Sequence, residues 1–206
     1  MNEKLGFKTE IWEKTEAKEI GEYESLKLGG HQVKIIKAEL YTGQSGNTSL
    51  RVLVDIAGND PQRDYFKNQY DNNENAEKKW AIAGTRYLSL KEENLAYTKG
   101  FIKALENSNK DFKFDLNKDW SQIETLFCAG VFGLEEYEAQ DGNVKVGTRL
   151  INFRSLDKLN EIKIPRVKKI DGSYIDYEKY QGQAESQVKQ IFNDASIEIK
   201  EEDLPF

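Results

Sequence analysis

The sequence predicts a mainly β fold, a β-barrel accompanied by one helix. Three observations lead to this expectation. Apolar and polar residues alternate along 49–57, two β-type segments flank an Asp141-Gly142 turn, and one stretch, 89–107, carries apolar residues at helical spacing. A chain of 206 residues is long enough for one domain of ordinary size with extensions.

The first two strands are expected on either side of a glycine-rich turn. Residues 31–41 are rich in β-branched and alternating side chains, which favours a strand. The turn at 42–48 contains glycines and an asparagine, which tolerate positive φ angles. Residues 49–57 then alternate, and the side chains expected to face the core are Leu50, Val52, Val54 and Ile56.

A long polar segment separates the second strand from the third. Residues 58–79 are rich in Asn, Asp and Gln, and we expect a loop that is functional or mobile, as loops of this length usually are. The third strand is expected at 80–88.

One helix is predicted after the third strand. Ser89 and Glu92 have the spacing of a capping box, and Asn107-Ser108-Asn109 ends the helical pattern. The apolar stripe between these signals consists of Leu90, Tyr97, Phe101 and Leu105. A further short turn is expected from Asp119, since Gln122 follows at capping distance.

A hairpin is expected to complete the body. Residues 127–139 and 144–156 flank the Asp141-Gly142 turn, which is a strong short-range hairpin signal. Gly130 and Gly133 lie inside the first arm, where they indicate a bulge or a sharp barrel corner.

The resulting order of three strands, a helix and two strands is the plan of a five-stranded OB-fold. An α+β sandwich is the competing interpretation. The expected organisation is an N-terminal extension at 1–28, an OB-fold domain at 29–171, a flexible linker that admits one short helix at 172–200, and an acidic tip at 201–206.

The composition argues against several classes of protein. One cysteine, Cys128, and one histidine, His31, offer neither an intrachain disulfide nor a soft ligand set for zinc. We interpret both as structural residues and expect no metal and no cofactor. The sequence has no apolar run long enough to span a bilayer, and its first residues lack the apolar stretch of a signal peptide. We therefore expect a soluble, intracellular protein with no membrane partner.

The net charge of −6 does not by itself favour a nucleic-acid partner, because phosphate binding depends on Lys and Arg. The charge is unevenly distributed, however. Residues 29–160 hold 18 basic and 19 acidic side chains, so the body is close to neutral. One basic face can therefore exist on it.

Candidate residues for binding a nucleic-acid strand follow from the chemistry of sequence-neutral binding, which needs cations along the backbone and aromatic faces under the bases. The segment 63–91 combines both kinds of residue, and its candidates are Arg63, Tyr65, Phe66, Lys67, Tyr70, Lys78, Lys79, Trp80, Arg86 and Tyr87. The predicted strands add Lys34, Lys37, Arg51, Arg149 and Arg154. For Phe66 and Trp80 a place in the core is the alternative, and for each strand cation the alternative is a solvated charge.

The six residues of the tip form the most specific motif. They are Glu201, Glu202, Asp203, Leu204, Pro205 and Phe206. An aromatic ring can fill a small apolar pocket with a basic edge, while carboxylates steer the encounter. The segment resembles the tip of bacterial single-stranded-DNA-binding proteins. That resemblance implies docking of replication, recombination and repair proteins.

A second resemblance covers most of residues 29–171. The body is similar to a family of proteins described as single-stranded-DNA-binding, from phages and prophages of Gram-positive bacteria. The residues that carry the similarity are Gly29-Gly30, Lys99–Ile102, Glu106–Asn109, Val131–Tyr137, Asp141-Gly142 and Arg154–Leu156. The resemblance implies a non-catalytic protein in the cytoplasm of a bacterial host cell, which coats and protects single-stranded DNA during phage or mobile-element replication or recombination. A homo-oligomer is left open.

Two alternatives remain. One is a single-strand annealing or recombination mediator protein. The other is a metal-dependent nuclease, for which Glu135, Glu136 and Glu138 are the carboxylates to consider. Strand alternation places Glu136 and Glu138 on one face and Glu135 on the other, which weakens the nuclease interpretation.

Overall fold

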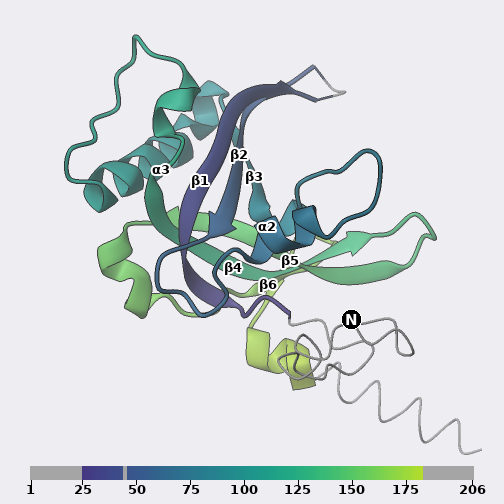
Figure 1. Cartoon of the computed structure of the whole chain (residues 1–206). Helices are drawn as coiled ribbons and strands as arrows, with labels where there is room; N and C mark the ends of the chain where they lie inside the picture. Colours follow the sequence, from purple (N-terminus) through teal and green to yellow (C-terminus); the bar gives the residue numbers. More distant parts are fainter. Residues whose placement is uncertain (1–24, 44–45, 183–206) are drawn as a thin grey trace, which may run out of the picture.

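The computed structural model describes residues 25–43 and 46–182 (Figure 1). The strands of this part of the chain are β1 (Gly29–Thr42), β2 (Thr48–Ile56), β3 (Thr85–Ser89), β4 (Phe127–Glu138), β5 (Val144–Arg154), β6 (Val167–Lys168) and β7 (Tyr174–Ile175). The helices are α2 (Tyr65–Asp71) and α3 (Leu95–Ser108), with 3-10 turns η1 (Ile82–Gly84), η2 (Glu92–Asn94), η3 (Trp120–Ile123) and η4 (Leu156–Glu161).

The seven strands of the described residues form one sheet in the order β3-β2-β1-β4-β6-β7, with β5 also paired to β4. β1 is antiparallel to both β2 and β4. β6 runs parallel to β4 at Glu135, beyond the point where β1 ends opposite Phe132. The predicted mainly β fold is thus confirmed. Within the described residues β5 contacts β3 without a hydrogen-bonded ladder between them, so the sheet is not closed.

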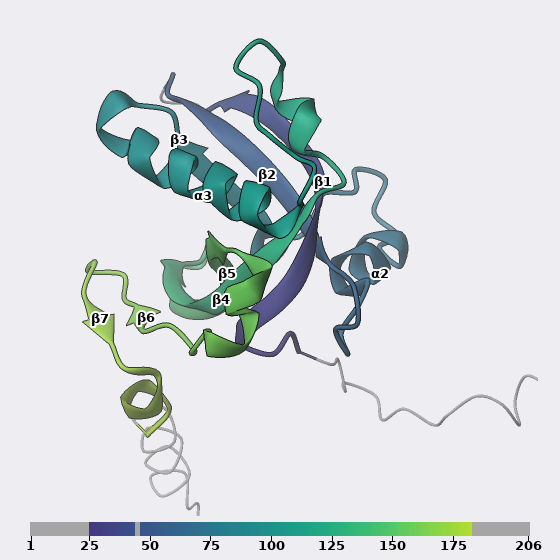
Figure 2. The same cartoon turned by 90° about the vertical axis from the view of Figure 1, so that its left-hand side faces the viewer.

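The core lies between the curved sheet and two helices. The predicted alternation of β2 is confirmed, since Leu50, Val52, Val54 and Ile56 are fully buried. α3 buries Phe101, whose ring lies 4.3 Å from that of Phe153 on β5. Figure 2 shows α3 and α2 well apart, with β1 and β2 between them in the view, and both helices bury side chains in the same core. Burial of each large apolar side chain contributes about 1.5–3 kcal/mol to folding.

The segment 58–79 is not simply a loop, because it contains α2. The Asp55 carboxylate accepts hydrogen bonds from the backbone N–H groups of Ile56 and Phe66, both at 2.9 Å. Phe66 itself is fully buried in the core. Burial raises the pKa of Asp55 although both N–H groups stabilise its charged form. A helix of seven residues is too short to reveal its periodicity in the sequence.

The third strand is shorter than expected and the predicted capping box is wrong. β3 begins at Thr85, after η1, instead of at Trp80. Ser89 Oγ accepts a hydrogen bond from Lys91 N at 3.3 Å. α3 starts only at Leu95, after η2, and has no side-chain cap. The predicted helix and its end near Asn109 are confirmed.

The later sequence signals agree with the structure. Asp119 accepts a hydrogen bond from Ser121 N at 3.0 Å at the start of η3. β4 and β5 pair as a hairpin, and Gly142 in its turn has φ 76°. The register shifts between Val131 and Phe132, which is a bulge between Gly130 and Gly133. A Cβ on Gly130 would lie 2.9 Å from Val33, so this glycine allows two strands to approach closely.

Described residues on both sides of 29–171 contact the body or extend its sheet. Leu26 is buried in the core, and Lys27 N donates to Gln62 Oε1 at 2.8 Å. At the other end β7 pairs with β6, and residues 177–182 are helical. Most of the predicted N-terminal extension, most of the predicted linker and the whole of 201–206 lie outside the described residues.

His31 and Cys128 are both buried in the body. His31 Nδ1 lies 2.8 Å from Asp60 Oδ2 and its Nε2 lies 2.9 Å from the Lys27 carbonyl oxygen. The ring thereby joins the start of the body to the segment that leads into α2. Burial raises the pKa of the Cys128 thiol well above its ordinary value. Of the helices within 25–182, none has the length and apolar character needed to cross a membrane.

Candidate nucleic-acid interface

A groove of about 400 Å³ lies on the outer face of β2 and β3. We call it the β2–β3 groove, and its lining residues are Arg51, Leu53, Lys78, Lys79, Trp80, Ile82, Thr85 and Tyr87. Two cross-strand pairs, Arg51 with Tyr87 and Leu53 with Thr85, form its floor. These side chains face outward because the alternate residues of β2 are buried in the core.

The edge of the groove comes from the segment between α2 and η1. Trp80 Nε1 donates to the Val54 carbonyl oxygen at 3.0 Å, which fixes the indole against β2. The rings of Trp80 and Tyr70 lie 5.6 Å apart, and the Lys78 ammonium lies 5.7 Å from the centre of the Tyr70 ring. Lys78 and Lys79 are both exposed. The burial of Phe66 anchors this whole segment to the body.

Arg51 is held at the centre of a polar and aromatic cluster. Its Nε donates to Glu39 Oε1 at 2.9 Å, and its guanidinium lies 5.1 Å from the centre of the Tyr41 ring. The Tyr41 and Tyr87 rings are 5.2 Å apart and remain 39% and 47% exposed. Lys37 approaches Glu39 at 2.6 Å. Hydrogen bonds from Lys37 and Arg51 hold the pKa of Glu39 below its ordinary value, so two cations share one carboxylate.

The β4–β5 hairpin carries a second pair of a cation and a ring. The Arg149 guanidinium lies 5.0 Å from the centre of the Tyr137 ring. Figure 1 shows the end of the β1–β2 hairpin, the segment 72–80 and the β4–β5 hairpin projecting from the same side of the body, on the right of the view. Cations and aromatic rings are therefore present on more than one of the elements that project there.

The residues predicted from the sequence divide among several places. The groove contains Arg51, Lys78, Lys79, Trp80 and Tyr87, and Tyr70 packs on its edge. Arg63 and Tyr65 line a separate hollow on α2, and Lys67 is ion-paired with Asp71 on the surface of the same helix.

Phe66 is removed from the candidate set. Its side chain has no exposed surface, and it packs against Phe132 with the ring centres 6.0 Å apart. A base cannot stack on a ring that the core encloses, so the alternative interpretation of Phe66 as a core residue is correct.

Three strand cations lie away from the groove. Arg86 pairs with Val52 on β2, and so it projects to the core side of β3. Its Nε is buried with no hydrogen-bond partner among the described residues, and burial lowers the pKa of its guanidinium. Arg154 lies at the end of β5 and lines a different pocket, described below. Lys34 lies on β1 between Asp55 and Phe127, also outside the groove.

The three carboxylates considered for a nuclease have separate surroundings. Glu135 forms an ion pair with Lys168 at 2.5 Å, and Glu136 accepts a hydrogen bond from Ile170 N at 3.2 Å. Glu138 is exposed near the hairpin turn. Within 25–43 and 46–182, no three His, Cys, Asp or Glu side chains converge as a metal site would require.

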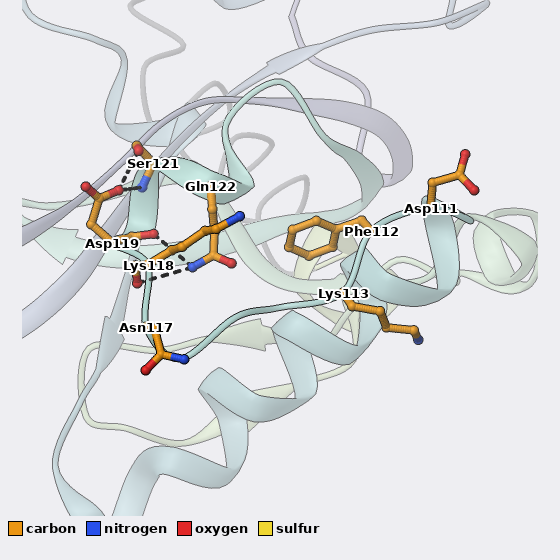
Figure 3. A pocket seen from close by; sticks show the side chains of 8 residues that line it. All are labelled: Asp111, Phe112, Lys113, Asn117, Lys118, Asp119, Ser121 and Gln122. Atoms are coloured by element: carbon orange, nitrogen blue, oxygen red, sulfur yellow. Dashed lines mark hydrogen bonds between the residues drawn. The ribbon is translucent and has the colours of Figure 1, made fainter.

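A larger hollow of about 680 Å³ lies on the loop between α3 and η3 (Figure 3). The Gln122 amide crosses it and donates to the carbonyl oxygens of Asp115 and Asp119, both at 2.9 Å. Its charged lining residues are two lysines and two aspartates, Lys113, Lys118, Asp111 and Asp119. The hollow contains no residue predicted to bind DNA, and its hydrogen bonds serve to hold the loop.

Lys37, a candidate from the sequence, lies on β1 and contacts Glu39, the carboxylate that Arg51 also contacts. Tyr41 beside Arg51, Tyr137 under Arg149, and Leu53, Ile82 and Thr85 in the groove were not predicted from the sequence. The alternation of residues along β1 could have indicated that Tyr41 faces outward. A register shift between Ile35 and Lys37 interrupts that alternation, so the sequence pattern did not show which residues of β1 face outward. No protein-family model matches this sequence, and no curated protein matches it.

Proposed function

We propose that this chain binds single-stranded DNA in the β2–β3 groove without catalysing a reaction. The observation that carries the proposal is the composition of the groove, which has three cations, two aromatic rings and no carboxylate among its lining residues. Cations follow the phosphates of a single strand, and rings stack on its bases without regard to sequence. The groove thus offers both elements of sequence-neutral binding in one place.

The order of the strands supports an OB-fold and hence this location. In the sheet the first five strands lie in the order β5-β4-β1-β2-β3, and in the chain α3 lies between β3 and β4. A five-stranded OB-fold is a partly open barrel that binds oligonucleotides on the face of strands 2 and 3 and with the loops that join strands 1 to 2 and 4 to 5. The β2–β3 groove occupies the first of these positions, and Tyr137 and Arg149 lie on the hairpin that supplies the last.

The biological role follows from the two resemblances of the sequence. The chain would coat and protect single-stranded DNA during phage or mobile-element replication or recombination. Residues 201–206 would recruit replication, recombination or repair proteins, because their carboxylates and the Leu204-Pro205-Phe206 group suit an apolar pocket with a basic edge.

Tryptophan fluorescence during titration with oligo-dT tests the proposal. Trp80 lines the groove, whereas Trp120 stacks on Phe114 at 5.3 Å in η3. We expect quenching that Trp80→Phe largely removes and Trp120→Phe leaves in place. Trp12, the third tryptophan of the chain, lies outside the described residues. Anisotropy of a labelled oligonucleotide measures binding independently of all three tryptophans. Failure of the intact chain to bind the oligonucleotide in dilute buffer would refute the proposal, and quenching that depends on Trp120 would refute the location.

A strand-annealing assay separates coating from the mediator alternative. A protein that only coats single strands slows the pairing of complementary oligonucleotides, and we expect this result. Faster pairing would favour an annealing protein that uses the same groove.

A further inference from the structure

A second pocket, also of about 400 Å³, lies on the outer face of β4 and β5. We call it the β4–β5 pocket. It shares no residue with the β2–β3 groove, and β1 separates β4 from β2 in the sheet. η4, which precedes one wall of the pocket, is the green helical turn at the lower left of Figure 1, whereas the hairpin ends project to the right.

The floor of the β4–β5 pocket is apolar and built by close packing. It consists of Val131, Ile151, Ile162 and Pro165. A Cβ on Gly133 would lie 2.6 Å from Pro165, and a Cβ on Gly30 would lie 2.9 Å from Ile162. The two glycines therefore allow the segment 162–165 to lie directly on β1 and β4. The pocket is formed before any ligand binds.

The edge of the pocket is basic. Arg154, Lys158 and Lys163 are exposed, and none of them forms an ion pair with another described residue. Glu161 is the one carboxylate among the lining residues of this pocket. No aromatic ring lines it, so a nucleobase would find no stacking partner. An apolar floor with an unpaired cationic edge favours a ligand that joins apolar side chains to carboxylates.

We propose that the β4–β5 pocket binds residues 201–206 of this same protein. Leu204, Pro205 and Phe206 match the apolar floor, and the three carboxylates of Glu201, Glu202 and Asp203 match the three cations. Eighteen residues separate Gly182 from Glu201, and a chain of that length can span up to roughly 60 Å. The tip can thus reach the pocket of its own molecule or that of a second copy.

Two consequences distinguish this interaction from DNA binding. A tip held in the pocket is withheld from other proteins, so partner recruitment requires its release. Because the pocket lies apart from the β2–β3 groove, the tip and a single strand can be bound together. The interaction does not depend on whether the groove binds DNA.

A labelled peptide with the sequence of residues 201–206 tests the proposal. The protein is the full chain carrying Phe206→Ala, so that its own tip does not compete. We expect saturable binding that is at least tenfold weaker when Lys158→Glu and Lys163→Glu are added. A matched pair, Lys78→Glu and Lys79→Glu, reverses the same charges in the groove and should leave peptide binding unchanged.

Two further measurements leave the protein itself unchanged. A peptide in which the last residue is alanine should bind at least tenfold more weakly than the unaltered peptide. Oligo-dT should not displace the peptide. Absence of saturable binding, or a loss caused by the Lys78 and Lys79 changes alone, would overturn the proposal. Loss of oligo-dT binding in the Lys158 and Lys163 variant would overturn it too, because it would identify the pocket as part of a DNA path.

Discussion

Two exposed lysines of the groove, Lys78 and Lys79, provide the sharpest test of where a single strand binds. For single strands, each phosphate contact contributes about 0.7 to the slope of log affinity against log salt concentration. Replacing both lysines by glutamine should lower that slope by about 1.4. Between 50 and 200 mM salt, the unaltered protein should then lose about sevenfold more affinity than the double variant. The measurement is anisotropy of a labelled oligo-dT at several salt concentrations.

The pair Lys158 and Lys163 is the matched control. Replacing these two lysines by glutamine removes the same charge from the β4–β5 pocket, and the slope should stay within error of the unaltered protein. Both variants should unfold at nearly the same temperature as the parent, because the four side chains are exposed. Equal slopes in the two double variants would refute the reasoning, since they would show that net charge and not contact in the groove sets the affinity.

Three further outcomes follow from particular contacts. Asp55→Ala should lower the free energy of unfolding by about 1–3 kcal/mol, because it leaves buried N–H groups without an acceptor, whereas Asp55→Asn keeps the acceptor. Since burial raises the pKa of Asp55, the free energy of unfolding should fall as the pH rises above 3.8, the ordinary pKa of this carboxyl group. Urea titrations at several pH values should show this dependence in the unaltered protein and its loss in the asparagine variant. Tyr87→Ala should weaken oligo-dT binding by roughly 5- to 150-fold through loss of stacking, and Tyr97→Ala, a 72% exposed ring on α3, should not; equal effects would contradict the groove. Gly133→Ala should lower the free energy of unfolding by about 1–3 kcal/mol through the clash with Pro165. An unchanged melting temperature would show that Pro165 can move away without cost, so that this part of the β4–β5 pocket is not tightly packed.

Much of the fold follows from local patterns. The alternation of β2, the helix α3 and the Asp141-Gly142 turn each depend on neighbouring residues, and each was predicted correctly. The stripe predicted for α3 was right only in part: Phe101 and Leu105 are buried, but Tyr97 is exposed and Leu90 precedes the helix. The short helix α2 was missed because its stability comes from Asp55 and the core around Phe66 and not from its own periodicity. β3 was predicted too long for a related reason, since Trp80 is fixed by a bond to β2 and not by pairing in a strand.

The sequence predicted which kinds of residue form the candidate site, but not which individual residues come together in it. The sequence identified a segment in which cations and rings are interleaved, and four of its proposed residues share the groove with Arg51 of β2. It could not separate Phe66, which is enclosed, from Trp80, which lines the groove. The sequence also could not show that Arg154 lines the β4–β5 pocket, or that Arg86 projects to the core side of β3.

By itself the sequence determined the β-rich architecture, the hairpin turn and the chemical character of residues 201–206, because these depend on the order of residues along the chain. Only the tertiary structure decided which charges are neighbours. Arg51 and Lys78 are 27 positions apart in the sequence and yet line one groove, because the burial of Phe66 draws the intervening segment back onto β2. Such contacts arise from packing between distant residues, for which a local pattern carries no signal.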